Sequence, residues 1–381
     1  MVDLGHAVRA MYFLCGVSDV GCHLGDTSLL AALARLYKDM VERKMYITYG
    51  IGSVHQWEGF GEPYDLPNDS AYCETCASIG LVFLTHRLLK WDWRTLANHG
   101  LKPREIADVL EGALYNAVGT GVSIDGKAFF YANPLETRGA NTERRDWFDV
   151  SCCPPNVARL FSSLGEYVFL TRTNLVDGVT RVTLAVVLYM ECVGEIEVNG
   201  RTIKVNIKTD WPSSGRVEVS FENAEDIEIE LRLRRPGWAE VLPFNTELRQ
   251  TSIHGNASEM DGFLHYPPRR YTTETITVEF PFTVKFIQPH PLVTQNQGCV
   301  AIRRGPFIYA METTDNDFTL SDARVIPGTY LEETISINGM ECKRLHIPGK
   351  LKGEGQTLKF IPYWSWGNRG TSDVLVWVES E

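Results

Sequence analysis

The residues with the clearest chemical capacity are acids and thiols gathered in two short segments of this 381-residue chain. The first segment spans 58–76, and the second, 151–156, contains two adjacent cysteines. Thiolates bind soft metals and attack carbon, and a carboxylic acid can protonate a leaving group. A site that holds both kinds of group could therefore carry out metal-assisted or nucleophilic chemistry.

Glu58 and Glu62 lie in a glycine-rich loop, 53–63, that also carries Trp57. Loops on a rigid scaffold often carry catalytic side chains. A glycosidase needs one carboxyl group as general acid and base, and an apolar neighbour such as Trp57 can raise the pKa of that group. The simpler interpretation is that both acids are solvated loop residues, as most charged side chains are.

Cys73 and Cys76 form a Cys-x-x-Cys motif, which is typical of half a zinc site or of a redox pair. Glu74 and Cys76 form a second candidate pair. Residues two apart on a helix point in nearly opposite directions, so this pair could bind one metal only where the backbone is extended or just entering the helix. A helix capped by Asp69 or Ser70 leaves that arrangement open. Buried, inert cysteines are the simpler alternative.

Cys152 and Cys153 are followed directly by Pro154 and Pro155. Adjacent cysteines are hard to pair with each other, which favours a metal ligand, a nucleophile or two unrelated thiols. The prolines fit the first turn of a helix, whose N-terminus lowers the pKa of a nearby thiol. A bound Zn²⁺ would ionise the thiol outright. Two buried free thiols in front of a helix remain the alternative.

The elements that must position these residues change in character near residue 170. Before it, apolar residues recur every three to four positions, which is the spacing of amphipathic helices. The expected helices span 26–43, 70–89, 104–118 and 157–169, with a fifth that ends near residue 15. Five such helices need partners to cover their apolar faces.

After residue 170, apolar and polar residues alternate in short runs, which is typical of strands. These runs span 181–189, 194–199, 202–207, 215–221, 227–233 and 274–280. Short strands separated by Asn-Gly and Pro-Gly turns predict an antiparallel β-sandwich. A break near 285–295, rich in proline and glutamine, divides two β modules. The predicted domains are 1–169, 170–287 and 288–381.

The overall composition limits the class of partner. The net charge is −11 and the pI about 5.4, which argues against nucleic acid or an anionic membrane surface as the main partner. No apolar run approaches the ~20 residues that span a bilayer. Nine cysteines, an odd number in a long chain, argue against a disulfide framework and favour a reducing compartment. No signal peptide is visible, so we expect a cytoplasmic protein.

Taken together, these segments resemble glycoside hydrolase family 127, the β-L-arabinofuranosidase-like family. The matching segments are 5–9, 46–50, 58–61, 64–69, 72–76, 130–136, 152–156, 233–238, 304–306 and 361–370. The spacing of acids and thiols is the specific part of this match, and the β part is less specific. The resemblance implies an (α/α)6 barrel followed by β-sandwich domains. It also implies a retaining exo-glycosidase that removes terminal β-L-arabinofuranose from a glycan.

The resemblance further implies a role for individual residues. Glu58 would be the general acid and base, and Cys152 would be the nucleophile that forms a thioglycosyl intermediate. His6 and Tyr131 would contact the sugar. The ligands of a Zn²⁺ ion would be Glu74, Cys76, Cys152 and Cys153.

The chain departs from the family in its number of helices. An (α/α)6 barrel has twelve helices, and only about half are expected here. We therefore expect a partial barrel with the zinc ligands retained and with weak or lost turnover. Its exposed apolar surface would favour association, for which a homodimer is one form.

Two other classes of function stay open. The chain could be a non-catalytic carbohydrate-binding or scaffold protein derived from such an enzyme, which would bind glycan without turnover. It could instead be a thiol redox protein that uses Cys73 and Cys76. A redox protein of this kind would hold no tightly bound zinc.

Overall fold

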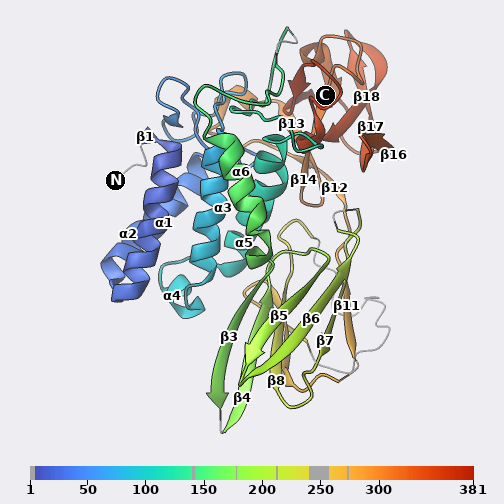
Figure 1. The fold of residues 1–381 in the computed structure, drawn as a ribbon. Coiled ribbons are helices and arrows are strands. Elements are labelled where there is room, and N and C mark those ends of the chain that lie inside the picture. The colour runs from blue at the N-terminus through green and yellow to red at the C-terminus, as the bar shows by residue number, and fades with distance from the viewer. Residues whose placement is uncertain (1–4, 140–141, 177, 212, 240–256, 273) are drawn as a thin grey trace.

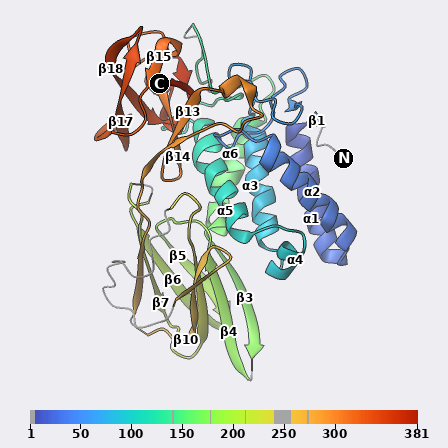
Figure 2. The same cartoon turned by 180° about the vertical axis from the view of Figure 1, so that it is seen from behind.

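A computed structural model describes residues 5–139, 142–176, 178–211, 213–239, 257–272 and 274–381 of the chain. Helices come first and sheets follow, so the predicted order of elements is confirmed (Figure 1). Figures 1 and 2 show three units: the helices, a set of strands below them, and a C-terminal set of strands beside their upper end.

Six α-helices are present in the described part of the chain. They are α1 Ala7–Leu24, α2 Thr27–Arg43, α3 Thr75–Leu89, α4 Trp93–Asn98, α5 Pro103–Gly112 and α6 Cys153–Ser162. Helix α3 lies at the centre, where it packs against α1, α5 and α6, and all of its residues except Arg87 are buried. Gly80 of α3 allows α1 to approach closely, because a Cβ there would lie 2.7 Å from the Cβ of Met11.

Helix α3 begins later than the sequence suggested. The N-cap is Glu74, with φ −56° and ψ 136°, so the expected cap at Asp69 or Ser70 is wrong. The backbone just before Glu74 is tied to neighbouring loops instead of turning into the helix. Cys73 has a φ of 40°, and its backbone N–H donates to the carbonyl of Gly52 at 2.9 Å. The extended approach to the helix leaves Glu74 and Cys76 near its first turn.

Helix α6 begins earlier than expected, at Cys153 instead of Val157. Proline lacks a backbone N–H, and the first turn of a helix has no intrahelical partner for that group. Pro154 and Pro155 are therefore compatible with this turn. The helix also ends earlier, at Ser162, and is followed by a 3-10 turn, Leu164–Tyr167.

The middle unit consists of two sheets. Their strands are β3 Phe169–Val176, β4 Val179–Val186, β5 Cys192–Val198, β6 Arg201–Thr209, β7 Arg216–Glu222, β8 Glu228–Arg234, β9 Ser258–Met260, β10 Phe263–Arg269 and β11 Thr275–Glu279. The strand orders are β3-β4-β8-β10-β9 and β11-β7-β6-β5. Both sheets contribute to one buried apolar cluster, so they pack face to face. Strand β4 runs parallel to β8, so the first sheet is not wholly antiparallel as expected.

The C-terminal unit has the strands β12 Val284–Ile287, β13 Cys299–Arg304, β14 Phe307–Glu312, β15 Ala323–Val325, β16 Leu331–Ile337, β17 Met340–Leu351, β18 Glu354–Pro362, β19 Val374–Leu375 and β20 Val378–Ser380. Their pairing runs β13-β20-β15-β17-β18-β14 and returns from β14 to β13, which closes a ring. This closed arrangement differs from the expected second sandwich. Strand β12 pairs with β13 and so belongs to this unit, although the sequence placed it in the middle domain.

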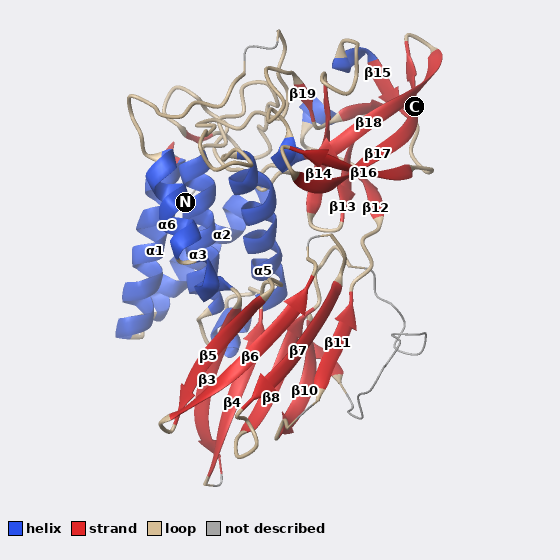
Figure 3. Cartoon of the chain, turned by 45° about the vertical axis from the view of Figure 1, so that its right-hand side comes forward, coloured by secondary structure: helices blue, strands red, loops and turns tan. Residues whose placement is uncertain are grey.

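Long loops gather at one end of the helices (Figure 3). Among the described residues they comprise 44–74, 121–139 and 142–152, and they contain β2 Gly59–Phe60, which pairs with β1 Gly5–His6. A buried cluster joins Tyr46 and Leu66 of these loops to Ile308 and Ile361 of the C-terminal strands. The C-terminal unit therefore supports the loops that carry the acids and thiols.

Three apolar side chains of α1 are exposed. Phe13 and Leu24 are 70% and 68% exposed, and Val20 is exposed beside them. Among the described helices, none combines the length and the hydropathy that crossing a membrane requires.

Candidate active site

Four of the predicted residues converge in one buried cluster. Ligand atoms of Glu74, Cys76, Cys152 and Cys153 all lie within 4.8 Å of one another. The Sγ atoms of Cys76 and Cys153 are 3.5 Å apart, and those of Cys152 and Cys153 are 3.8 Å apart. Cys152 Sγ lies 3.2 Å from Glu74 Oε1. We call these four residues the thiol–acid cluster.

The N-termini of two helices bring the cluster together. Glu74 is the N-cap of α3, and Cys76 lies in its first turn. Cys152 is the N-cap of α6, and Cys153 is its first residue. Because α3 packs against α6, segments about eighty residues apart in the sequence meet here. The partial positive charge at a helix N-terminus stabilises anionic groups, so both helices favour ionised ligands.

A short ladder places His6 beside Glu58. His6 pairs with Gly59 between β1 and β2, and the backbone N–H of Ala7 donates to the Glu58 carbonyl at 2.9 Å. The two backbones approach so closely that a Cβ on Gly59 would lie 2.2 Å from the carbonyl oxygen of Gly5. Glu58 itself has a φ of 51°, an uncommon conformation for this residue type that the ladder holds in place.

The carboxylate of Glu58 is held from two sides. His6 Nε2 lies 3.0 Å from Glu58 Oε2, and the hydroxyl of Tyr72 donates to Glu58 Oε1 at 2.9 Å. Ligand atoms of His6, Glu58 and Glu74 also lie within 4.8 Å of one another. Glu74 thus links the His6–Glu58 pair to the thiol–acid cluster, and both belong to one site.

Tyr131 lies on the same site. Its Oη is 3.2 Å from Cys152 Sγ, and its carbonyl accepts from the backbone N–H of Thr75 at 3.0 Å. Its ring contacts those of Tyr72 and Phe148 at centroid distances of 6.0 Å and 5.4 Å. Tyr131 is therefore fixed between the thiol–acid cluster and the hydroxyl that contacts Glu58.

Without a cation, most of the groups in the thiol–acid cluster are hard to ionise. Burial, together with the charge of Cys152, raises the pKa of Glu74 to about 9. Hydrogen bonding to Cys152 raises the pKa of Cys153, and the same interaction with burial raises that of Cys76. Hydrogen bonds from Cys153 and Cys76 instead lower the pKa of Cys152.

The donor set fits a metal ion. Glu74 Oε2 is buried and has no hydrogen-bond partner among the described residues, which is costly for a carboxylate oxygen unless a cation binds it. Three sulfurs and one oxygen around a common centre are ligands that soft or borderline divalent metals accept. A divalent cation would also allow several of these groups to be ionised together. The cluster could therefore hold a metal ion.

The structure brings all seven predicted site residues together and separates them from two other candidates. Glu62 is exposed, unlike the partly buried Glu58. Cys73 is buried in a different apolar cluster, against Gly50, and burial raises its pKa. Cys76 lies beside Cys153 instead, with 3.5 Å between the two Sγ atoms, so Cys73 is not part of the thiol–acid cluster.

Three residues that contact this site had no role predicted from the sequence. Tyr72 donates to Glu58, Asn156 donates to Cys76, and Tyr12 donates to Asn156. Tyr72 and Asn156 lie inside the motifs 72–76 and 152–156, which was the available signal. For Tyr12, only helical spacing was visible.

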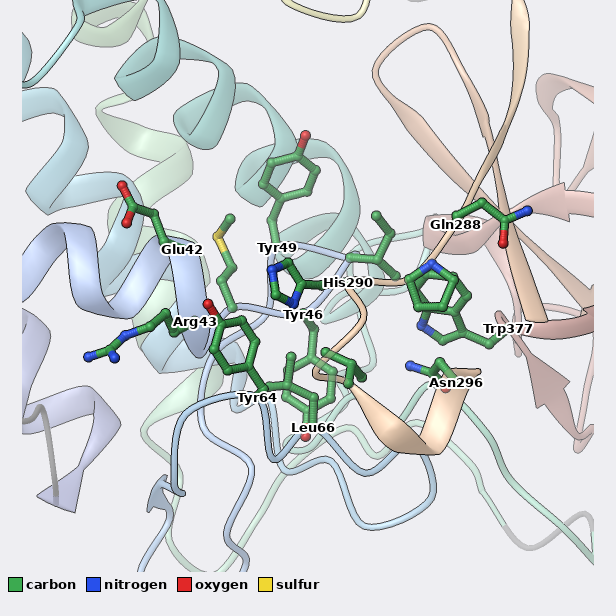
Figure 4. Close-up of a pocket in the computed structure, with 14 residues that line it drawn as sticks. Glu42, Arg43, Tyr46, Tyr49, Tyr64, Leu66, Gln288, His290, Asn296 and Trp377 are labelled. Carbon is green, nitrogen blue, oxygen red and sulfur yellow. The ribbon is translucent and has the colours of Figure 1, made fainter. Parts of the chain in front are cut away.

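A separate cavity of about 240 Å³ lies between the loop region and the C-terminal unit (Figure 4). Among the described residues that line it are Tyr46, Tyr64, His290 and Trp377, and the rings of Tyr64 and His290 stack at 4.5 Å. None of the seven predicted site residues lines this cavity. This cavity is therefore separate from the thiol–acid cluster.

Comparison with known proteins connects this geometry to one family. The model of the β-L-arabinofuranosidase GH127 catalytic domain matches residues 2–166. Models of the GH127 middle domain and of the glycoside hydrolase family 127 C-terminal domain match residues 183–282 and 284–379. The three models between them account for nearly the whole chain.

Individual relatives agree with these models. The chain is 32% identical over 413 aligned residues to a non-reducing end β-L-arabinofuranosidase of Bifidobacterium longum subsp. longum, covering 98% of this chain and 59% of that protein. The crystal structure of a GH127 β-L-arabinofuranosidase from Geobacillus stearothermophilus T6 is 31% identical with a TM-score of 0.87, covering 100% of this chain and 61% of that one. A GH127 β-arabinofuranosidase structure is 31% identical with a TM-score of 0.86, covering 100% and 60%. The chain thus spans about 60% of the length of these relatives.

Proposed function

Because this chain belongs to glycoside hydrolase family 127, we propose that it hydrolyses terminal β-L-arabinofuranosides with retention of anomeric configuration. The observation that carries the proposal is the convergence of three sulfurs and one carboxylate beside the His6–Glu58 pair. The chain spans about 60% of its relatives, so turnover by this chain is part of the proposal.

We propose Zn²⁺ as the metal, held by Glu74, Cys76, Cys152 and Cys153. Zinc accepts cysteine sulfur and glutamate oxygen in four-coordinate sites. Glu74 Oε2, which has no hydrogen-bond partner in the described part of the chain, supports a cation there. When bound, zinc would keep the Cys152 thiolate ionised and stabilise it as a leaving group.

The proposed reaction consists of two successive displacements at the anomeric carbon. In the first, Cys152 Sγ attacks the anomeric carbon, the glycosidic C–O bond breaks, and Glu58 protonates the departing oxygen. In the second, Glu58 removes a proton from water, the water oxygen attacks the anomeric carbon, and the C–S bond breaks. Two inversions at one carbon give net retention. The products are arabinose and the shortened glycan, with one water consumed.

Three aromatic and imidazole groups would orient the sugar and the catalytic carboxyl. His6 and Tyr72 hold the two oxygens of Glu58, which fixes the direction in which its proton is delivered. Tyr131 Oη is 3.2 Å from Cys152 Sγ, so a sugar bound with its anomeric carbon at this sulfur would have a neighbouring hydroxyl within reach of Tyr131. We propose that His6 and Tyr131 contact the sugar.

The finer architecture belongs to the same proposal. We infer that the helices are part of an (α/α)6 barrel and that the middle unit is a β-sandwich. The domains would be 1–169, 170–287 and 288–381, the last beginning at Val284 if β12 is counted with its partner strand. Weak or lost turnover, a homodimer and a cytoplasmic location stay predictions from the sequence.

The function is tested by following hydrolysis of 4-nitrophenyl β-L-arabinofuranoside by NMR. The zinc-loaded chain is expected to release β-arabinose first, and the same chain stripped by a chelator is expected to be inactive until zinc is restored. The α-arabinofuranoside is the matched control and should not turn over. Release of α-arabinose first, or full activity without metal, would contradict the proposal. Glycan binding by the zinc-loaded chain without any turnover would favour the non-catalytic alternative.

A further inference from the structure

Two residues outside the predicted set form a hydrogen-bond chain that ends on a sulfur of the thiol–acid cluster. Asn156 Nδ2 donates to Cys76 Sγ at 3.1 Å, and Tyr12 Oη donates to Asn156 Oδ1 at 2.8 Å. The chain crosses three helices, from α1 through α6 to α3. We propose that Asn156 is a positioning residue that stabilises the Cys76 thiolate as a metal ligand and that Tyr12 acts through Asn156. This inference rests on the proposed zinc site.

The charge of the site requires such a donor. Three thiolates and one carboxylate carry four negative charges, and a divalent cation neutralises only two of them. The remaining charge must be stabilised by helix N-termini and by hydrogen-bond donors. Cys76 is 0% exposed, so bulk water does not provide the donor. The amide N–H of Asn156 provides it without adding a charge that would compete with the metal.

The hydroxyl of Tyr12 determines which end of the amide faces the sulfur. An asparagine side chain can present either its NH₂ group or its oxygen, and the oxygen would repel a thiolate. Because Tyr12 donates to Oδ1, the NH₂ group is left pointing at Cys76. Burial raises the pKa of Tyr12 to about 12, so its hydroxyl keeps the proton that it donates.

Neighbouring side chains hold the tyrosine in this position. The Tyr12 ring makes an edge-on contact with Phe83 at a centroid distance of 6.1 Å. The guanidinium of Arg159 lies 5.7 Å from the centre of the Tyr12 ring and 5.0 Å from that of Phe83. Arg159 lies on α6, like Asn156. The packing of α1 against α3 and α6 therefore fixes the orientation of the Tyr12 hydroxyl.

The test is the zinc affinity of variants, measured by competition with a chromophoric chelator. Asn156→Leu keeps a similar volume without the amide, and we expect it to weaken zinc binding about 10- to 100-fold, as loss of a hydrogen bond to a ligand does elsewhere. Asn156→Asp places an oxygen against the sulfur and should weaken binding at least as much. Tyr12→Phe should weaken it less, because the amide remains but is free to rotate. Tyr37→Phe is the matched control, since the buried Tyr37 hydroxyl has no partner among the described residues.

A double variant distinguishes an effect of Tyr12 that is transmitted through Asn156 from a general loosening of the helix packing. If Tyr12 acts through the amide, Tyr12→Phe should cause no further loss of affinity in the Asn156→Leu background. Cobalt(II) gives a second measurement, because the energy of its sulfur-to-metal charge-transfer band should shift in Asn156→Leu and Asn156→Asp but not in Tyr37→Phe.

Specific results would overturn the inference. Zinc affinity of Asn156→Leu within about twofold of the parent, or an unshifted cobalt band, would overturn it while leaving the zinc site intact. A parent chain that binds no zinc would instead refute the proposed function. If the leucine variant does not fold, Asn156→Asp and Tyr12→Phe compared with Tyr37→Phe decide the question.

Discussion

Replacing Cys152 with alanine is expected to lower turnover of β-L-arabinofuranosides on the order of 10⁴-fold or more, because the first displacement loses its nucleophile. The loss should be similar for a good and a poor leaving group, since neither can depart without attack at the anomeric carbon. The measurement is kcat/KM for 4-nitrophenyl and alkyl β-L-arabinofuranosides, with the zinc content of each variant determined in parallel. Cys152 is also a proposed ligand, so kcat/KM is compared per bound zinc.

Glu58→Gln should give a different pattern, which separates the two roles. Without its acid, the first displacement should be slow for alkyl or sugar leaving groups and much less affected for nitrophenolate, which needs little protonation. The second displacement also loses its base, so the thioglycosyl form should accumulate and appear as one added arabinosyl mass on the intact chain. Glu62→Gln is the matched control, because Glu62 is an exposed acid of the same loop. Cys152→Ala with more than a tenth of parental kcat/KM, or Glu62→Gln as damaging as Glu58→Gln, would refute these assignments.

Replacing Glu111 with alanine is expected to cost about 3–5 kcal/mol of unfolding free energy. The Arg234 side chain is 0% exposed and lies between α5 and β8, where Nη2 contacts Glu111 and Nη1 donates to Asp108 at 2.7 Å. Trp238 Nε1 also donates to Glu111, at 2.8 Å. Removing the Glu111 carboxylate leaves the buried guanidinium of Arg234 paired with Asp108 but no longer with Glu111. This loss occurs at the junction between the helices and the middle unit.

The measurement is denaturant unfolding followed by tryptophan fluorescence, with zinc present throughout. Glu259→Ala is the matched control, because Glu259 pairs with the adjacent Arg235 at the surface and should contribute about 1 kcal/mol or less. Glu111→Gln keeps acceptor and size while removing the charge, so it should fall between the two. Equal stability of Glu111→Ala and Glu259→Ala would mean that the Arg234 pair does not join the units.

Residue types and spacing singled out the two segments that form the site, but taken alone they left buried, inert cysteines as the simpler interpretation. The resemblance to glycoside hydrolase family 127 was what suggested a role for each residue. What the sequence left open was whether Glu74 and Cys76 could point the same way. The structure answers this through the backbone before α3, where Cys73 has a φ of 40° and Glu74 serves as the N-cap. That conformation depends on hydrogen bonds to distant loops, which no local propensity encodes.

In the two strand-rich units, the sequence predicted individual strands better than it predicted their pairing. Alternation of apolar and polar residues located β4 to β8 and β11 of the middle unit, because one face of each of these strands is buried. It could not tell which strands pair, and the parallel pairing of β4 with β8 and the closed ring of the C-terminal unit both depend on long connections. The contact of Tyr12 with Asn156 was equally hidden, since the two residues lie 144 positions apart and meet only when α1 and α6 pack on α3.

The most direct test of the central claim is zinc K-edge X-ray absorption on the purified chain. We predict one zinc per chain with three sulfur neighbours at about 2.3 Å and one oxygen neighbour at about 2.0–2.2 Å. Loss of one sulfur in Cys153→Ser and loss of the oxygen in Glu74→Ala would identify the ligands. A chain that binds no zinc, or a zinc surrounded only by nitrogen and oxygen, would contradict the account.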